Sequence, residues 1–221
     1  MLLKNKTMLG MAALTLAGGM AMLAVPAANA ATMRCGKECA TLASQKYGAS
    51  NVMAVGASST VGLAAFWYNQ GEDFLAELEG NVYDLHKAGV IAGSVNKTYS
   101  SDEVFQYVYD PVGKTTDECL GATPGSTAVT LMPCGASVNT LWVGLSGLQH
   151  GNFMPLMSAA LSTNSAMLLT ATSASGPLSV IQMNLNTTTS NGVTTTTDAS
   201  NQMWETVQGV YGNSSVNADR G

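Results

Sequence analysis

A small frame built around tryptophan occurs twice in the chain and constrains its fold more than any other feature. It is Asn139-Thr-Leu-Trp142 in the stretch NTLWVG and Asn201-Gln-Met-Trp204 in the stretch NQMWET. The chain has only three tryptophans and 6% aromatic residues, so two of the three tryptophans share one frame. Recurrence of this kind is typical of a chain built from repeated units.

The segments that lead to these tryptophans also share one order. Each begins with an apolar pair, passes through a turn rich in Gly and Ser, enters an alternating apolar strand and closes on Asn-x-x-Trp. A third segment has the same order, with Gly71 and Phe74 in place of Asn and Trp. The three segments are 52–74, 119–142 and 168–204. Their aromatic ends predict three units of about 60 residues each.

Most of the chain reads as short apolar runs that are bounded by Gly, Pro, Asn or Ser. The candidate strands are 51–55, 62–68, 73–80, 104–111, 128–134, 141–145, 167–172, 178–185 and 203–211. Many short strands without long helical patterns between them predict an all-β fold, a sandwich or a barrel. The stretch VYDLHKAGVIAG, residues 82–93, is the main exception, because a helical turn that ends near Gly89 is an alternative there.

The first thirty residues have the pattern of a secretory signal peptide. Lys4 and Lys6 give a basic start, an apolar run follows, and PAANA ends in small residues at Ala30. The alternative is a membrane anchor, but a span needs about 20 mostly apolar residues, and this run is shorter and is followed by a cleavage-like site. We expect cleavage after Ala30, no stable membrane insertion afterwards, and a secreted or cell-envelope protein.

Residues 31–48 form a separate N-terminal segment with four-residue cysteine spacing. Good helix formers between Met33 and Tyr47, followed by Gly48, predict a short helix there. Four cysteines in an exported chain indicate two disulfides, for which three connectivities exist. We favour local pairing, because each pair is close in sequence: Cys35 with Cys39, and Cys119 with Cys134. A four-cysteine metal site is the alternative; we expect no metal and no cofactor.

The charge balance restricts the partners that the protein can have. Removal of Lys4 and Lys6 would leave seven basic residues against fourteen acidic ones, a net charge of −7. An acidic surface repels the phosphate backbone, so we expect no nucleic acid partner. Only 10% of the residues are charged, which is typical of an extracellular β-rich protein with many polar turns.

One segment, NTTTSNGVTTTTDASN at residues 186–201, is low in complexity. Asn191-Gly192 is a strong hairpin signal, and threonine favours strands. We therefore predict a surface loop or a threonine-rich hairpin turned at Asn191-Gly192; an interdomain linker is the alternative.

The repeated frames resemble the ricin B-type family of β-trefoil lectins, whose signature is Gln-x-Trp near the end of each of three repeats. Gln202-Met-Trp204 matches this signature, while Thr140-Leu-Trp142 and Glu72-Asp-Phe74 are degraded forms. Cys119-Leu120, the following strand and Cys134 are similar to one such repeat. The chain is also similar to a set of uncharacterised bacterial secreted proteins that combine an N-terminal Cys pair with these repeats.

The resemblance implies a pseudo-threefold barrel of six strands capped by three hairpins. We assign this domain to residues 49–212 and a flexible tail to 213–221. The resemblance also implies that Phe74, Trp142 and Trp204 are structural core residues, since a large aromatic at the same place in each repeat can fill the barrel centre.

The family's sugar sites use an acidic residue just after the opening Cys-Leu, an aromatic platform and a polar amide. The corresponding positions here are Ala54, Gly121 and Thr170, and none of them is acidic. The exposed candidate is instead FWYNQGED, in which Trp67 and Tyr68 would stack on a sugar and Asn69 and Asp73 would bind its hydroxyl groups. The alternative is that the aromatics face the core and the acids solvate a turn.

Catalytic motifs are missing from the sequence. It contains no Gly-x-Ser-x-Gly, His-Glu-x-x-His, P-loop or Gly-x-Gly-x-x-Gly pattern, and we expect no catalytic residues. The first hypothesis is a secreted non-catalytic module that binds a glycan or cell-surface polysaccharide. The second is an extracellular protein-interaction or structural module, including a protease inhibitor, on a trefoil whose sugar sites are lost. A hydrolase that uses His86 or His150 is the third.

Overall fold

The strands follow one another in three sets of four. The computed structural model describes residues 40–66, 72–111, 116–135, 137–190 and 193–208. The first set is β1 (Ala40–Ser44), β2 (Asn51–Val55), β3 (Val61–Ala65) and β4 (Phe74–Asn81). The second is β5 (Glu103–Tyr109), β6 (Glu118–Ala122), β7 (Val129–Pro133) and β8 (Leu141–Gly144). The third is β9 (Met154–Ser158), β10 (Met167–Ala171), β11 (Leu178–Gln182) and β14 (Met203–Gln208).

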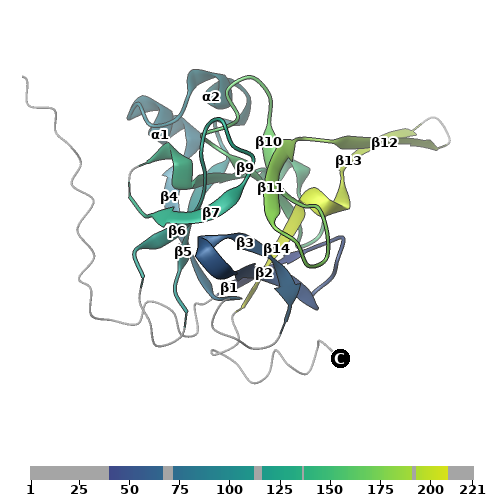
Figure 1. Ribbon diagram of the computed structural model, residues 1–221. Helices are drawn as coiled ribbons and strands as arrows, with labels where there is room; N and C mark the ends of the chain where they lie inside the picture. The colour runs from purple at the N-terminus through teal and green to yellow at the C-terminus, as the bar shows by residue number, and fades with distance from the viewer. Residues whose placement is uncertain (1–39, 67–71, 112–115, 136, 191–192, 209–221) are drawn as a thin grey trace, which may run out of the picture.

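Three kinds of shorter element connect these strands. They are the helices α1 (Val82–Lys87) and α2 (Gly93–Tyr99), the hairpin of β12 (Leu185–Ser190) with β13 (Val193–Asp198), and the 3₁₀ turns η1 (Ala57–Ser59), η3 (Val138–Thr140), η4 (Ser146–Leu148) and η5 (Ser200–Gln202). Figure 1 shows the two helices together at one end of the molecule and the β12–β13 hairpin extending away from its body.

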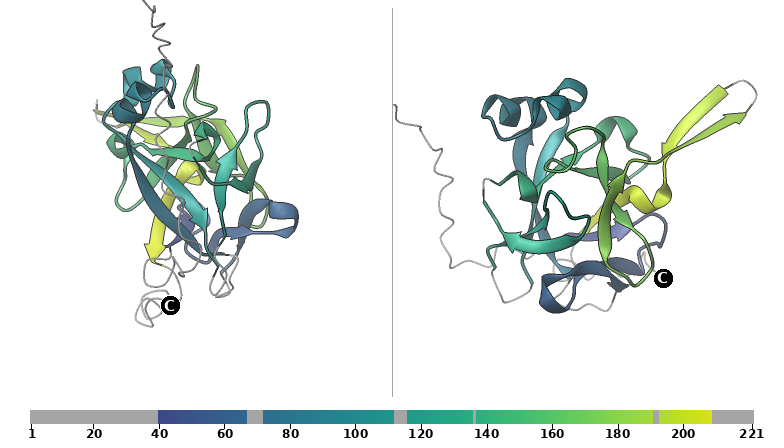
Figure 2. Two further views of the ribbon diagram at one scale, coloured as in Figure 1. Left: turned by 90° about the vertical axis from the view of Figure 1, so that its left-hand side faces the viewer. Right: turned by 45° about the horizontal axis from the view of Figure 1, so that its top comes forward.

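The first and fourth strands of the three sets close a six-stranded antiparallel barrel. Its pairs are β1 with β4, β4 with β5, β5 with β8, β8 with β9, β9 with β14, and β14 with β1. The second and third strands of each set form the hairpins β2–β3, β6–β7 and β10–β11. Figure 2 gives two further views of this arrangement.

The three hairpins touch one another in a closed triangle. Single bridges join Thr60 to Thr130, Gly62 to Pro177 and Ala128 to Ser179, so each hairpin meets the other two. A closed barrel of six strands under three mutually bridged hairpins is the β-trefoil architecture. The predicted fold class is therefore confirmed.

The core contains the aromatic residue of each repeat. Phe74, Trp142 and Trp204 are buried in one cluster with apolar residues from all three sets of strands. Burial of one such ring stabilises the fold by on the order of 4 to 6 kcal/mol before the entropic cost of ordering it.

The Asn-x-x-Trp frame corresponds to a 3₁₀ turn that leads into the fourth strand of a repeat. The turns η3 and η5 precede β8 and β14 directly. The indole Nε1 of Trp142 donates to the carbonyl of Leu120 at 2.9 Å, and that of Trp204 donates to the carbonyl of Leu169 at 2.9 Å. Leu120 and Leu169 are each the third residue of the second strand, so the frame ties the fourth strand to the second in both repeats.

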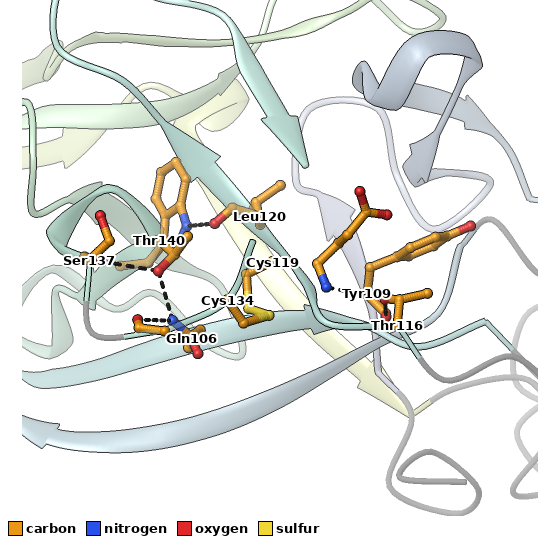
Figure 3. The surroundings of a disulfide bond; sticks show 11 residues. Gln106, Tyr109, Thr116, Cys119, Leu120, Cys134, Ser137 and Thr140 are labelled. Atoms are coloured by element: carbon orange, nitrogen blue, oxygen red, sulfur yellow. Dashed lines mark hydrogen bonds between the residues drawn. A yellow bond between two sulfur atoms is a disulfide. The ribbon is translucent and has the colours of Figure 1, made fainter. Parts of the chain in front are cut away.

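Buried glutamines support these frames in two different ways. Gln202 of the matching signature donates to Thr170 Oγ1 and to the carbonyl of Gln182, both at 3.1 Å. In the second repeat Thr140 stands at that position, and Gln106 of β5 donates to its Oγ1 at 2.7 Å (Figure 3). The amide therefore comes from a neighbouring strand where the signature is degraded.

The disulfide between Cys119 and Cys134 lies close to this second frame (Figure 3). Cys119 belongs to β6, and Cys134 follows β7 directly, so the bond closes the β6–β7 hairpin. Cys35 and Cys39 lie outside the described residues, as do the predicted signal peptide and the predicted C-terminal tail.

A second apolar cluster covers one end of the barrel. Val82, Ile91 and Val95 of the helical insertion pack with residues from β5, β8, β9 and β10. The Oδ1 atom of Asn81 accepts the N–H of Asp84 at 2.9 Å and begins α1. The helical alternative for residues 82–93 is thus correct as far as Lys87, whereas α2 was not predicted. Among the described helices, none has the length and apolar character that a membrane span needs.

The predicted helix between Met33 and Tyr47 is wrong for the part that the structure describes. Residues 40–44 form β1, a fully buried strand that pairs with β14 over five residues and also with β2 and β4. Long-range pairing therefore overrides the local helix propensity of this segment. The barrel therefore includes Ala40–Ser44, which lie before the predicted domain start at residue 49.

The predicted threonine-rich hairpin is present. β12 and β13 pair in register from Leu185 with Asp198 to Ser190 with Val193, which leaves Asn191-Gly192 as the two connecting residues.

Candidate functional site

An open cleft of about 410 Å³ lies between the β2–β3 hairpin and the turn that joins β10 to β11. We call it the hairpin cleft. It is lined by Ala54, Val55, Gly56, Ala57, Thr60, Gly62, Leu63, Ala64, Ser175, Gly176 and Pro177. Its two walls come from the first and the third repeat, so it is a product of the trefoil and not of one local motif.

The walls meet through a backbone contact that only glycine permits. Leu63 N–H donates to the carbonyl of Gly176 at 2.9 Å. A Cβ atom on Gly62 would lie 2.8 Å from the same oxygen and 3.4 Å from the Cα of Pro177. Glycine is used where two backbones approach this closely, so Gly62 sets the distance between the two walls.

The rim of the hairpin cleft carries a strained turn. Ser58 and Ser59 have φ values of 57° and 58°, in the left-handed region that non-glycine residues rarely adopt. The turn is closed by Gly56 N–H, which donates to the carbonyl of Thr60 at 2.8 Å. Each such residue costs on the order of 1 kcal/mol or more and is found preferentially at ligand-binding positions.

The lining is uncharged. Its side-chain hydroxyl groups come from Thr60 and Ser175, and its other side chains are small and apolar. A charged ligand would lose its hydration here without gaining an ionic partner from these residues. The hairpin cleft is suited to a neutral ligand that combines hydroxyl groups with apolar surface.

The three positions that correspond to the acidic sugar-binding residue have different surroundings. Ala54, Gly121 and Thr170 are each the fourth residue of the second strand in their repeat. A Cβ on Gly121 would lie 2.4 Å from Met132 Sδ. The hydroxyl of Thr170 is buried and donates to the carbonyl of Leu168 at 2.9 Å. Of these three residues, only Ala54 contributes to the lining of the hairpin cleft.

The sequence-predicted ligand residues do not line this cleft. Trp67, Tyr68 and Asn69 lie outside the described residues. Asp73, which we expected on an exposed surface, is fully buried, as is Glu72. The alternative that these acids solvate a turn is therefore also wrong, because the chain is drawn into the barrel where β4 begins and where Asp110 N–H donates to the carbonyl of Asp73 at 3.2 Å.

Asp73 is the centre of a small group of carboxyl groups. Neither of its carboxyl oxygens has a hydrogen-bond partner among the described residues. Burial, followed by the charges of Glu72 and Asp110, raises the pKa of Asp73 to about 6. The pKa of Tyr109 is also raised, by burial and by the charges of Asp73 and Glu118. In the part of the chain that the structure describes, no three His, Cys, Asp or Glu side chains are grouped to hold a metal ion.

The two histidines considered for a hydrolase lie in different segments. The backbone N–H of His150 donates to the carbonyl of Phe153 at 2.8 Å, whereas His86 lies in α1, near Asp84. Asp84 accepts from the Nδ2 of Asn81 at 2.7 Å at the start of α1. The Nδ1 atom of His86 lies 2.9 Å from the carbonyl oxygen of Ile91. This contact of His86 links α1 to the segment that follows the helix.

Sequence reasoning missed the residues that line the hairpin cleft. Ser175 and Pro177 lie in a Gly- and Ser-rich turn that was counted only as a boundary between strands. The hairpin cleft forms only when the first and third hairpins are brought together in the fold. The sequence feature that could have indicated it is the Gly176-Pro177 turn, which lies opposite Gly62 in the structure.

Comparison with solved structures gives distant likenesses, which include the two proteins named below. No protein-family profile matches the chain, and no curated protein matches its sequence. A designed threefold symmetric protein, ThreeFoil, is 14% identical, with a TM-score of 0.45 over 77% of this chain and 99% of that one. The β-trefoil lectin of the Vibrio vulnificus hemolysin/cytolysin, solved with N-acetyl-D-lactosamine bound, is 14% identical, with a TM-score of 0.44 over 78% of this chain and 96% of that one.

Proposed function

We propose that the protein is a secreted, non-catalytic module that binds a neutral carbohydrate in the hairpin cleft. The observation that carries this proposal is the open, uncharged cleft of about 410 Å³ beside Ala54. Its volume falls in the range of about 300 to 1,000 Å³ that small-molecule sites occupy.

The chemistry of the lining supports a sugar rather than a charged metabolite. The hydroxyl groups of Thr60 and Ser175 can both donate and accept hydrogen bonds, as sugar hydroxyls require. The apolar side chains of Val55, Leu63 and Pro177 suit the C–H face of a pyranose ring. The ligand would be a glycan or a cell-surface polysaccharide whose bound residue is neutral.

Two features support export. The first thirty residues have the pattern of a signal peptide, and the disulfide between Cys119 and Cys134 is of a kind that persists in oxidising compartments.

The test uses two tryptophan substitutions at equivalent positions of two repeats. Ser175 is exposed at the fourth position of the β10–β11 turn, and Ser126 is exposed at the fourth position of the β6–β7 turn, which has the same length. We expect Ser175→Trp to fill the mouth of the hairpin cleft and to weaken glycan binding by at least about tenfold, the equivalent of about 1.4 kcal/mol. Ser126→Trp lies away from the cleft and should leave the affinity unchanged.

Binding would be found on a glycan array and measured by calorimetry on the purified protein. Equal affinities for the wild type and Ser175→Trp would exclude the hairpin cleft as the site. A folded protein that binds no glycan at all would contradict the proposed function and would favour the extracellular protein-interaction or structural module.

A further inference from the structure

The β12–β13 hairpin has two open sheet edges. β12 and β13 form a separate two-stranded sheet, and neither strand pairs with any other strand among the described residues. Figure 1 and the right-hand view of Figure 2 show the hairpin leading away from the body of the molecule. We call it the threonine arm, because threonine occupies three consecutive register pairs, 187 with 196, 188 with 195 and 189 with 194.

One hydrogen bond at the base of the arm fixes which backbone groups point outward. Ala199 N–H donates to the carbonyl of Asn184 at 3.0 Å. Hydrogen-bonded and non-hydrogen-bonded pairs alternate along an antiparallel ladder, so the pairs at 186, 188 and 190 of β12 are hydrogen-bonded within the arm. The residues between them, Thr187 and Thr189 on β12 and Thr194 and Thr196 on β13, direct their N–H and C=O groups outward.

The arm lacks the devices that normally protect an exposed edge. Natural edge strands carry lysine, proline or a bulge that prevents pairing with another chain. Residues 185–197 contain no proline and no charged residue, and the register of the arm has no shift. A two-stranded hairpin is only marginally stable by itself in water, so the arm gains stability when another strand is added.

We propose that β12 pairs antiparallel with β12 of a second copy of this chain and forms a four-stranded sheet across a twofold axis. The second copy is the fitting occupant because residues 185–197 are uncharged and the arm leads away from the body (Figure 1), so two copies can meet at the arm while their acidic bodies, which repel each other, stay apart. The β12 edge is used rather than the β13 edge because residues 185–190 of β12 carry no charge, whereas β13 ends in Asp198, and a charged residue on an edge strand opposes pairing with another chain.

The alternation of the ladder limits the registers of this contact, because outward-facing groups must meet outward-facing groups. The register that uses all three outward residues of β12 pairs Thr187 with its own copy on the axis and Leu185 with Thr189. This pairing forms about six backbone hydrogen bonds. The contact is isologous and closes at a dimer.

The test substitutes proline for the two register partners Thr187 and Thr196. Proline removes an N–H group and is tolerated in a strand where that group faces away from the ladder. Thr187→Pro therefore removes the donor on the axis, while Thr196→Pro removes the matching donor of the opposite edge. Sedimentation velocity over a wide range of protein concentrations gives the dissociation constant of each variant.

We expect a concentration-dependent dimer for the wild type and for Thr196→Pro, and a dimer at least about tenfold weaker for Thr187→Pro. A second variant replaces residues 185–198 by two glycines between Asn184 and Ala199, whose backbone groups are already hydrogen-bonded. It should keep its thermal unfolding transition and sediment as a monomer.

Three results would overturn the proposal: a wild type that is monomeric at every concentration, a dimer that survives removal of the arm, or equal dissociation constants for Thr187→Pro and Thr196→Pro.

Discussion

The indole N–H groups of Trp142 and Trp204 distinguish two repeats from the first, in which Phe74 has no donor. In the second and third repeats the indole N–H satisfies a buried carbonyl, that of Leu120 or Leu169. The tryptophan therefore contributes a specific cross-strand bond in addition to its apolar area.

We predict that Trp204→Phe lowers the free energy of unfolding by about 1 to 3 kcal/mol, because it removes the donor to the buried Leu169 carbonyl and part of the buried ring. Urea unfolding measures the change. Tyr83→Phe is the control, since Tyr83 is an exposed aromatic residue and should change the stability by less than about 0.5 kcal/mol. An unchanged stability of Trp204→Phe would mean that the bond contributes nothing net.

Asp73 makes the stability depend on pH in the direction opposite to that of a paired carboxylate. Its pKa in the folded state is raised from 3.8 to about 6, so the folded protein binds more protons than the unfolded chain between these values. The stabilisation of the folded state that Asp73 contributes is fully present below about pH 3.8 and is lost as the pH rises through about 6. A shift of this size corresponds to at most about 3 kcal/mol.

We therefore expect Asp73→Asn to raise the melting temperature at pH 7.5 by several degrees and to reduce the fall in stability between pH 4 and pH 6. The neighbouring carboxyl groups of Glu72 and Asp110 remain in the variant. Glu103→Gln removes an exposed carboxylate from β5 and is the control. A lower melting temperature for Asp73→Asn at pH 7.5 would mean that the ionised carboxylate is stabilised in the folded protein.

At the scale of elements, the three hairpins meet through backbone bridges as well as through the apolar side chains that they bury together. In one of these contacts Gly62 lies directly against the backbone of Gly176, at the base of the hairpin cleft. The first repeat therefore depends on the third for its shape.

We predict that Gly62→Ala destabilises the protein by about 1 to 3 kcal/mol, because the new Cβ would lie 2.8 Å from the backbone oxygen of Gly176 and overpacking costs about this much. Gly147→Ala is the matched control, since a Cβ on Gly147 meets no atom within 4 Å. Thermal unfolding with both variants separates steric overlap from the general effect of replacing glycine. Equal melting temperatures for the two would contradict the tight contact.

The elements that could be predicted from the sequence are those with a local signal. Asn191-Gly192 between threonine-rich arms predicted the β12–β13 hairpin, and Asn-x-x-Trp indicated equivalent places in two repeats, which prove to be the starts of β8 and β14. The strand β1 could not be predicted from its own residues, because Ala40 and Leu42 are good helix formers and the partner strand β14 lies at the other end of the chain. The strands β6 and β9 were also absent from the candidates.

At the scale of the whole molecule, the threefold frame could be predicted and the site could not. The spacing of Phe74, Trp142 and Trp204 indicated three units, and all three rings lie in the shared core. The burial of Asp73 depends on β5, which comes much later in the sequence, and the hairpin cleft depends on two repeats that meet only after folding. A linear pattern of residues carries neither kind of information.

The pairing of β1 with β14 means that the first and last strands of the described chain are neighbours, joined over five residues from Ala40 with Gln208 to Ser44 with Trp204. A ribosome or a secretion channel that delivers the chain from its N-terminus releases β14 last, so the barrel stays open along this seam until synthesis or export is almost complete. Contacts between such distant segments form slowly. Closure of the barrel therefore has to wait for a strand that lies more than 150 residues after β1 in the sequence.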